Sequence, residues 1–153
     1  MPLTKSELVA FLSKPRMAHL ATTSTEGNPR VSPIWYVYED GCFYFTTRVG
    51  RVKSDHIQRN PHVALSIACD ERPYRAVCAF GTAQLVRRER DKWLERISTR
   101  YGEREGREWL SEAVKQEGRV VFRLQPDRIM SWHYGRDDAE RQERGESMTT
   151  KIS

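Results

Sequence analysis

The Asp40-Gly41 pair constrains the fold of this chain more than any other local feature. An Asp-Gly pair between two β-prone segments is typical of a two-residue hairpin turn, because both central residues of that turn need a positive φ. The preceding segment covers residues 30–38 and the following one residues 42–47. We therefore expect these two segments to pair as antiparallel strands.

Alternating apolar and polar residues, or apolar runs between turn residues, indicate further strands. These cover residues 17–22, 62–69, 74–86 and 119–124, and a last segment covers residues 128–134. Gly81 lies inside one of them and predicts a bulge or a bend. The chain is therefore expected to be mainly β, with six antiparallel strands in a small β-barrel, because closure removes exposed strand edges.

Helices are expected around this barrel. Thr4-Lys5-Ser6-Glu7 is a capping box that begins a short helix, and residues 53–59 form another before Asn60-Pro61. Residues 88–115 carry tryptophans and leucines at helical spacing, which predicts two helices with core-facing anchors. We expect a single domain over residues 1–135, followed by a charged, flexible tail over residues 136–153.

Composition limits the classes of partner. The net charge of +5 and the isoelectric point near 9.3 favour anionic ligands. The basic residues do not form a block with interleaved aromatic residues, so nucleic acid is not an expected partner. The hydrophobic fraction of 38% is low, which indicates much exposed helix or a core that a partner subunit completes.

The cysteines and the N-terminus bear on the compartment. Cys42, Cys69 and Cys78 form no C-x-x-C pair and have no histidine at a metal-ligand spacing, so we expect free thiols and no metal site. The N-terminal residues lack the pattern of a signal peptide, and no apolar run approaches the ~20 residues of a membrane span. A cytoplasmic protein without membrane contact is expected.

The segment from Phe45 to Ser54 is the strongest candidate for a binding site. Thr46 and Thr47 end a strand, Gly50 lies in the turn, and Arg51 and Lys53 stand where a helical pattern begins. Hydroxyl groups, cations and the unpaired N–H groups of a helix start are the donors that a phosphate group needs. Arginine adds a planar fork for phosphate oxygens and lysine adds a point charge.

A set of motifs, together with this turn, resembles a known family. They are Leu20-Ala21-Thr22, Gly27-Asn28-Pro29-Arg30-Val31-Ser32-Pro33-Ile34-Trp35-Tyr36, Asn60-Pro61-His62-Val63-Ala64-Leu65, Phe80-Gly81-Thr82-Ala83 and Phe122-Arg123-Leu124-Gln125-Pro126-Asp127-Arg128-Ile129-Met130-Ser131-Trp132. In order and spacing the chain resembles the pyridoxamine 5'-phosphate oxidase-like family, which has a split β-barrel of the FMN-binding type. It looks closest to the branch of flavin/deazaflavin-dependent oxidoreductases, whose members use coenzyme F420.

The resemblance implies a homodimer with two cofactors in grooves at the subunit interface. It implies that the strand from Val31 to Trp35 runs beneath the cofactor ring and that the last segment reaches the ring from the other subunit. The implied cofactor-binding residues are Val31, Ser32, Pro33, Trp35, Thr46, Thr47, Arg51, Val52, Lys53, Trp132 and His133. Arg48 is a further candidate for the phosphate, and Trp35 is as well explained by core or interface packing.

Three functions remain open on this basis. The first is an F420-dependent reductase of a small unsaturated molecule, and the second is an FMN-dependent oxidoreductase of the same barrel. The third is a non-enzymatic protein that binds a flavin or haem. No side chain stands out as a catalytic acid or base, because the cofactor carries the chemistry. Oxidation of vitamin B6 is not expected, since an Arg-x-His element that the true oxidases carry is absent after Trp132.

Overall fold

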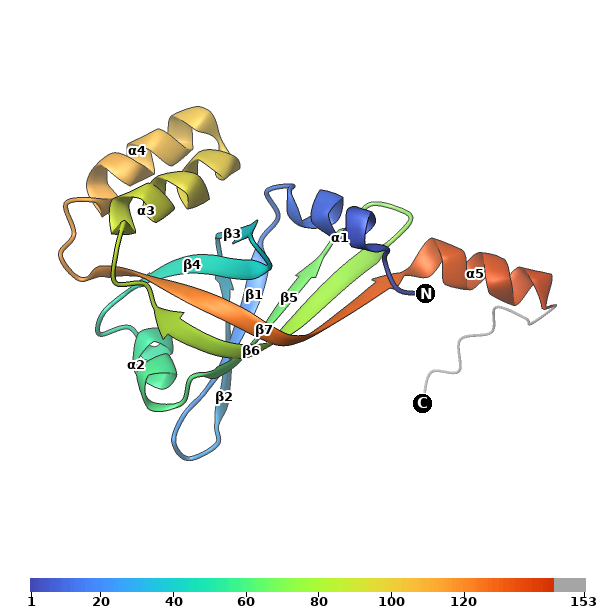
Figure 1. The fold of residues 1–153 in the computed structure, drawn as a ribbon, viewed down its shortest axis with the longest axis horizontal. Helices are drawn as coiled ribbons and strands as arrows, with labels where there is room; N and C mark the ends of the chain where they lie inside the picture. The colour runs from blue at the N-terminus through green and yellow to red at the C-terminus, as the bar shows by residue number, and fades with distance from the viewer. Residues whose placement is uncertain (145–153) are drawn as a thin grey trace.

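The structure is a computed structural model that describes residues 1–144, and residues 145–153 of the expected tail lie outside the described part. Its centre is one antiparallel sheet of seven strands in the order β2-β1-β5-β6-β7-β4-β3 (Figure 1). The strands are β1 (Ala18–Thr23), β2 (Pro29–Ile34), β3 (Tyr36–Glu39), β4 (Cys42–Arg48), β5 (His62–Ala68), β6 (Arg75–Leu85) and β7 (Arg119–His133). The sheet is curled, so the mainly β, split-barrel fold class is confirmed.

The helices lie at the periphery of the sheet (Figure 1). They are α1 (Lys5–Leu12), α2 (Val52–Arg59), α3 (Arg90–Ser98), the 3-10 turn η1 (Thr99–Tyr101), α4 (Glu103–Ala113) and α5 (Tyr134–Glu143). The expected capping box begins α1, since the Glu7 backbone N–H donates to Thr4 Oγ1 and the Thr4 N–H donates to the Glu7 carboxylate. Among the described residues, no helix combines the length and the apolar character that crossing a membrane requires.

The strand count differs from the expected six in two places. The segment over residues 30–38 is two strands, β2 and β3, because the chain turns a corner at Trp35. The segments over residues 119–124 and 128–134 are one long strand, β7, which pairs with β6 from Phe122 to His133 and with β4 from Arg119 to Leu124. The expected bulge is present at Phe80/Gly81, where a β-carbon on Gly81 would overlap the Gln125 carbonyl.

The expected tail begins with a helix, which the sequence analysis did not predict. α5 shows no apolar periodicity, but it is built from good helix formers such as Glu, Arg, Ala and Gln. Two contacts fix its first turn. The Arg136 N–H donates to His133 Nδ1, and the Arg136 guanidinium pairs with Glu7 of α1 at 2.5 Å.

The two edges of the sheet meet at Trp35. β2 and β3 are the edge strands, yet a single residue separates them along the chain, so the sheet must curl until its edges touch there. Beyond this corner the edges separate. β3 pairs with β4 only as far as the Tyr36–Phe45 pair, and residues 46–48 of β4 pair with β7 alone. The barrel is therefore closed at the corner and split beyond it.

The helical unit α3–η1–α4 holds this corner. The Trp35 ring stacks on Tyr101 at 4.8 Å with an interplanar angle of 4° and also contacts Trp109. The Tyr36 N–H donates to the Tyr101 hydroxyl, which in turn donates to the Arg16 carbonyl. Burial raises the pKa of Tyr101 to about 12, so this hydroxyl keeps its proton. Arg100 donates to the Tyr36 carbonyl from the same turn.

Two apolar clusters flank the sheet. The larger fills the inside of the barrel and includes Tyr36, Phe43 and Phe45, none of which is exposed. The smaller lies under α3 and α4, where Tyr44 of β4 stacks on Trp93. β4 is therefore buried on both faces up to residue 45, and its end is the part that is free to line a site.

We predict that Tyr101→Phe destabilises the fold by about 1–3 kcal/mol, since it removes the acceptor of the Tyr36 N–H and a donor to Arg16 while keeping the ring stack. Urea unfolding measures this change. The control is Tyr74→Phe, whose side chain is 43% exposed and whose loss should cost less than about 0.5 kcal/mol. Equal effects of the two substitutions would contradict the role of Tyr101 at the corner.

Candidate functional site

A hollow of about 480 Å³ occupies the split between β2 and the end of β4. We call it the split pocket. It takes residues from β2, β4, the following turn, the start of α2 and the start of β7: Arg30, Ser32, Thr46, Thr47, Arg48, Gly50, Arg51, Val52, Lys53 and Arg119. Gly50 has φ +86°, a left-handed conformation that glycine adopts without strain, and this turn carries β4 directly into α2.

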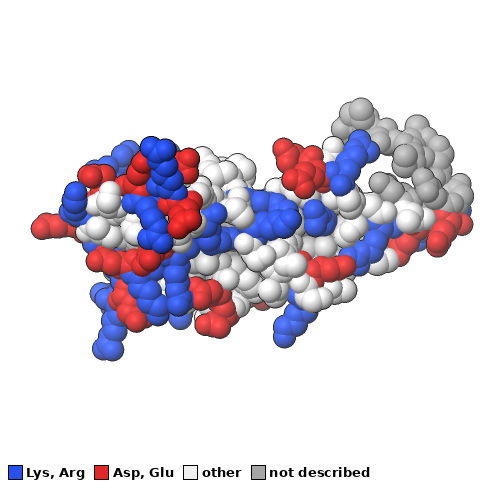
Figure 2. All heavy atoms as spheres, turned by 90° about the horizontal axis from the view of Figure 1, so that it is seen from above, with Lys and Arg blue, Asp and Glu red and all other residues white. Residues whose placement is uncertain are grey.

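The split pocket is strongly basic. Five of its residues are cations, Arg30, Arg48, Arg51, Lys53 and Arg119, and no acidic residue lines it. Within residues 1–144 none of the five forms an ion pair with a carboxylate. On α3 and α4, by contrast, acids and bases are paired, and Figure 2 shows the two signs interspersed toward that end of the molecule.

The cations repel one another inside this pocket. Burial lowers the pKa of Lys53, and the charges of Arg30 and Arg51 lower it further. Burial likewise lowers the pKa of Arg119, and the charges of Arg48 and Arg51 add to the effect. Both shifts mean that the folded protein holds these charges at an energetic cost that a bound anion would relieve.

Neutral donors complete the pocket. The Thr47 hydroxyl is buried without a hydrogen-bond partner among the described residues, although it lines the pocket. The Thr46 hydroxyl donates to the Val120 carbonyl and keeps its lone pairs free to accept. α2 begins at Val52 without a side-chain cap, so the backbone N–H groups of its first turn are available. Cations, an orphaned hydroxyl and a helix start are the donors that fit a phosphate group.

The structure gathers six of the predicted residues in this pocket: Ser32, Thr46, Thr47, Arg51, Val52 and Lys53. Sequence reasoning missed Arg30 and Arg119, which come from strands far apart in the chain. Arg119 lies opposite Arg48 in the β4–β7 register. The alternation in β7 was visible in the sequence, but its pairing with β4 was not, so no local signal could place Arg119 there.

The outer face of the sheet carries a second group of predicted residues. The register places Val31 beside Ala21, Ala64 and Phe80 on neighbouring strands, and Trp132 beside Ala76. Val31 is 65% exposed. Small or apolar side chains on this outer face are Ala21, Val31, Pro33, Ala64, Ala68, Ala76, Cys78, Phe80, Met130 and Trp132, and the polar residues His19, Ser66 and Arg128 lie on the same face. Exposed apolar patches on a protein surface are a common feature of interaction sites.

Trp35 and His133 lie apart from both groups. Trp35 packs on Tyr101 and Trp109 at the corner of the barrel, which accounts for its position by packing. His133 follows Trp132 in β7, and successive residues of a strand point to opposite faces, so the two side chains diverge. His133 lines a separate hollow under α1.

A sequence model of the pyridoxamine 5'-phosphate oxidase family matches residues 4–133, most of the described chain. The chain belongs to this family. No curated protein sequence matches it.

Several solved structures share the fold of this chain. A conserved hypothetical protein from Mycobacterium tuberculosis is 21% identical with a TM-score of 0.72, covering 99% of this chain and 93% of its own. The heme storage protein HutZ from Vibrio cholerae is 23% identical and has a TM-score of 0.67, and the match covers 85% of this chain and 94% of HutZ. An F420 reductase is 24% identical and has a TM-score of 0.63, and the match covers 78% of this chain and 93% of the reductase. At these identities the likeness concerns the fold.

We predict that Lys53→Met stabilises the phosphate-free protein by about 0.5–1 kcal/mol at pH 7, because it removes one of several repelling charges. The gain should shrink as the pH rises toward 10.5. The pKa of Lys53 is lowered on folding, so the unfolded chain binds more protons in that interval and wild-type stability rises with pH there. Thermal unfolding at several pH values measures both effects.

Lys115→Met is the matched control, since Lys115 pairs with Glu112 on the surface and its removal should give no gain. Added inorganic phosphate should raise the melting temperature of wild type more than that of Lys53→Met. A loss of stability in Lys53→Met, or an unchanged response to phosphate, would refute the assignment of Lys53 to an anion site.

Proposed function

We propose that this protein binds coenzyme F420 in the split pocket and uses it to transfer a hydride to a small unsaturated substrate. The observation that carries the proposal is the set of five cations without acidic partners around the orphaned Thr47 hydroxyl. Arg51 and Lys53 hold the phosphate group, with Thr46, Thr47 and the start of α2 as further donors. Arg30, Arg48 and Arg119 lie around the same pocket.

The number of cations favours F420 over FMN. The phosphate monoester of FMN carries about −1.5 to −2 charges at pH 7, which two or three cations balance. F420 joins its phosphate to a long tail of carboxylates, so its total negative charge is larger. Five cations in one pocket match such a tail better than a single phosphate group.

The edge strand β2 supports the ring of the cofactor in this proposal. β2 pairs with β1 on one side only, so half of its backbone N–H and C=O groups are free at the edge. Val31, Ser32 and Pro33 lie in this strand, between the split pocket and the apolar outer face. When bound, F420 supplies a hydride at a ring carbon. The protein's own contribution is to position the ring, neutralise the phosphate and exclude water.

A homodimer completes the site in the proposal. The apolar outer face reaches from Val31 to Trp132 across five strands, and a second copy of the chain is the occupant that we propose for it. Trp132 of the partner subunit would then reach the ring over β2. His133 remains a predicted contact, but its ring lies on the other side of β7.

An FMN-dependent oxidoreductase is the alternative. The donors for the phosphate group itself suit both cofactors, and only the additional cations of the pocket favour F420. The family model describes an oxidase of pyridoxamine 5'-phosphate, whereas one structural neighbour carries the name F420 reductase. Direct comparison of the two affinities separates the two proposals.

We predict that F420 binds the wild-type protein more tightly than FMN does, and that an Arg51→Ala/Lys53→Ala double variant loses at least about a hundredfold in F420 affinity. Each charge-assisted contact is worth roughly 1.5–3 kcal/mol, and 1.4 kcal/mol is a factor of ten. Titration followed by cofactor fluorescence gives both affinities.

The control is Arg87→Ala/Arg88→Ala, which removes the same charge beside a different hollow near Trp93. It should bind F420 as wild type does, apart from a small, salt-dependent loss. Equal affinity of wild type and the Arg51/Lys53 variant would remove the site assignment. Tighter binding of FMN than of F420 would identify FMN as the cofactor and would keep the assignment of the split pocket as its site.

We predict that Phe80→Glu converts a dimer into a monomer, because it buries a charge in the centre of the proposed interface. Sedimentation velocity measures the oligomeric state. Leu85→Glu is the control, since Leu85 lies in the same strand β6 and both side chains are 39% exposed. Dimers that persist in Phe80→Glu, or that dissociate equally in Leu85→Glu, would contradict the proposed interface.

A further inference from the structure

A second hollow of about 310 Å³ lies between α1 and the paired ends of β6 and β7. We call it the α1 pocket. Arg119 begins β7 in the split pocket and His133 ends the same strand here, so the two sites are about 45 Å apart along the strand. Three cations, Lys14, Arg16 and Arg75, line the α1 pocket together with the apolar side chains of Leu3 and Ala10.

The Phe11 ring fixes two of these cations. The guanidinium carbon of Arg16 lies 4.2 Å from the ring centroid and that of Arg75 lies 5.6 Å from it, both as cation–π contacts. Arg16 also donates to the Phe11 carbonyl at 2.6 Å, and Arg75 Nε donates to the Pro73 carbonyl at 3.3 Å. Each guanidinium has five N–H donors, so most of them remain available in a fixed position.

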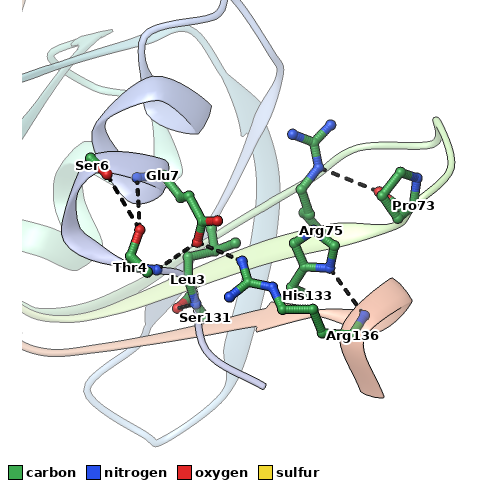
Figure 3. Close-up of polar contacts among 9 residues, drawn as sticks. All are labelled: Leu3, Thr4, Ser6, Glu7, Pro73, Arg75, Ser131, His133 and Arg136. Atoms are coloured by element: carbon green, nitrogen blue, oxygen red, sulfur yellow. Dashed lines mark hydrogen bonds and ion pairs between the residues drawn. The ribbon is translucent and has the colours of Figure 1, made fainter. Parts of the chain in front are cut away.

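The acidic residue of the pocket does not balance these cations. Glu7 is already bound to Arg136 and to the Thr4 N–H, and these contacts hold the pKa of Glu7 at about 2 (Figure 3). Within the described residues, Lys14, Arg16 and Arg75 form no ion pair with a carboxylate. The α1 pocket therefore keeps a net positive charge.

His133 adds a ring N–H donor to the α1 pocket. It lies opposite Arg75 in the β6–β7 register (Figure 3). His133 Nδ1 accepts the Arg136 N–H at 3.3 Å. In the neutral ring the proton is therefore on Nε2, which can donate a hydrogen bond. Arg75 and His133 are neighbours on paired strands, whereas Leu3 and Ala10 come from the N-terminal segment and α1.

We propose that the α1 pocket is a second ligand site, which binds a small organic carboxylate with an apolar body. In this proposal the carboxylate lies against the guanidinium groups of Arg16 and Arg75, Lys14 adds a third positive charge to the lining, and the apolar body lies against Leu3 and Ala10. A planar guanidinium binds a carboxylate through two parallel hydrogen bonds, which fits this end of the pocket. The site does not depend on the cofactor proposed for the split pocket.

The probe for this site is 3-phenylpropionate, titrated into the full chain by calorimetry and by the shifts of the Leu3 and Ala10 methyl signals in NMR spectra. We expect binding to wild type, and at least about a tenfold loss of affinity in Arg75→Gln, since one charge-assisted contact is worth that factor. Arg72→Gln is the control, because Arg72 lies in the same hairpin over Tyr74 and does not line the pocket. It should bind like wild type.

Two further comparisons separate this proposal from the function proposed above. The Arg51→Ala/Lys53→Ala variant should bind 3-phenylpropionate unchanged, and 3-phenylpropanol, which lacks the charge, should bind wild type much more weakly. Binding that is lost in the Arg51/Lys53 variant would assign the probe to the split pocket and overturn the proposal. Failure of wild type to bind, or equal affinity in Arg75→Gln and Arg72→Gln, would also overturn it.

Discussion

The corner at Trp35 is the constraint on which the rest of the structure depends. One residue joins the two edge strands of the sheet, so the sheet has to curl, and it can stay closed only near that residue. The split that opens beyond the corner is where Arg30 and Ser32 of β2 come to face the end of β4. The aromatic stack of Trp35 on Tyr101, and the hydrogen bonds of Tyr101, fix the corner to the helical unit. The same helical unit contacts the split pocket through Arg119, whose guanidinium lies over the Trp109 ring of α4.

The split pocket combines an unfavourable arrangement of charges with a favourable arrangement of donors. Cations with lowered pKa values and a buried hydroxyl without a partner both destabilise a folded protein in the absence of a ligand. Such features are typical of sites where stability is lost for the benefit of binding. A ligand that binds only the folded state returns this free energy, which is why a tightly bound anionic cofactor is consistent with these residues.

Sequence reasoning succeeded where the signal is local. The Asp40-Gly41 hairpin, the Thr4–Glu7 capping box and the bulge at Gly81 each depend on a few neighbouring residues, and all three are present. The turn from Thr46 to Lys53 is also local, and all of its residues except Val49 line one pocket. The mainly β barrel followed from the number and spacing of the strands, and the split-barrel type followed from the resemblance to the family.

Reasoning from the sequence failed where distant segments meet. The break at Trp35 arises from closure of the sheet, and a β-prone run that continues through it gives no sign of a corner. Arg30 and Arg119 reach the pocket through strand pairings that a single sequence does not display. The first turn of α5 is held by the contact of Arg136 with Glu7, which is 129 residues away in the chain. Because α5 is charged and has no apolar periodicity, the sequence alone did not predict this helix.

A crystal structure of the protein grown with F420 tests the central claim most directly. The account predicts density for the phosphate group between Thr47, Arg51 and Lys53 in the split, with the ring along β2 and against Trp132 of a second subunit. A cofactor bound elsewhere, or a split pocket that opens to bulk solvent far from any contact between subunits, would contradict it.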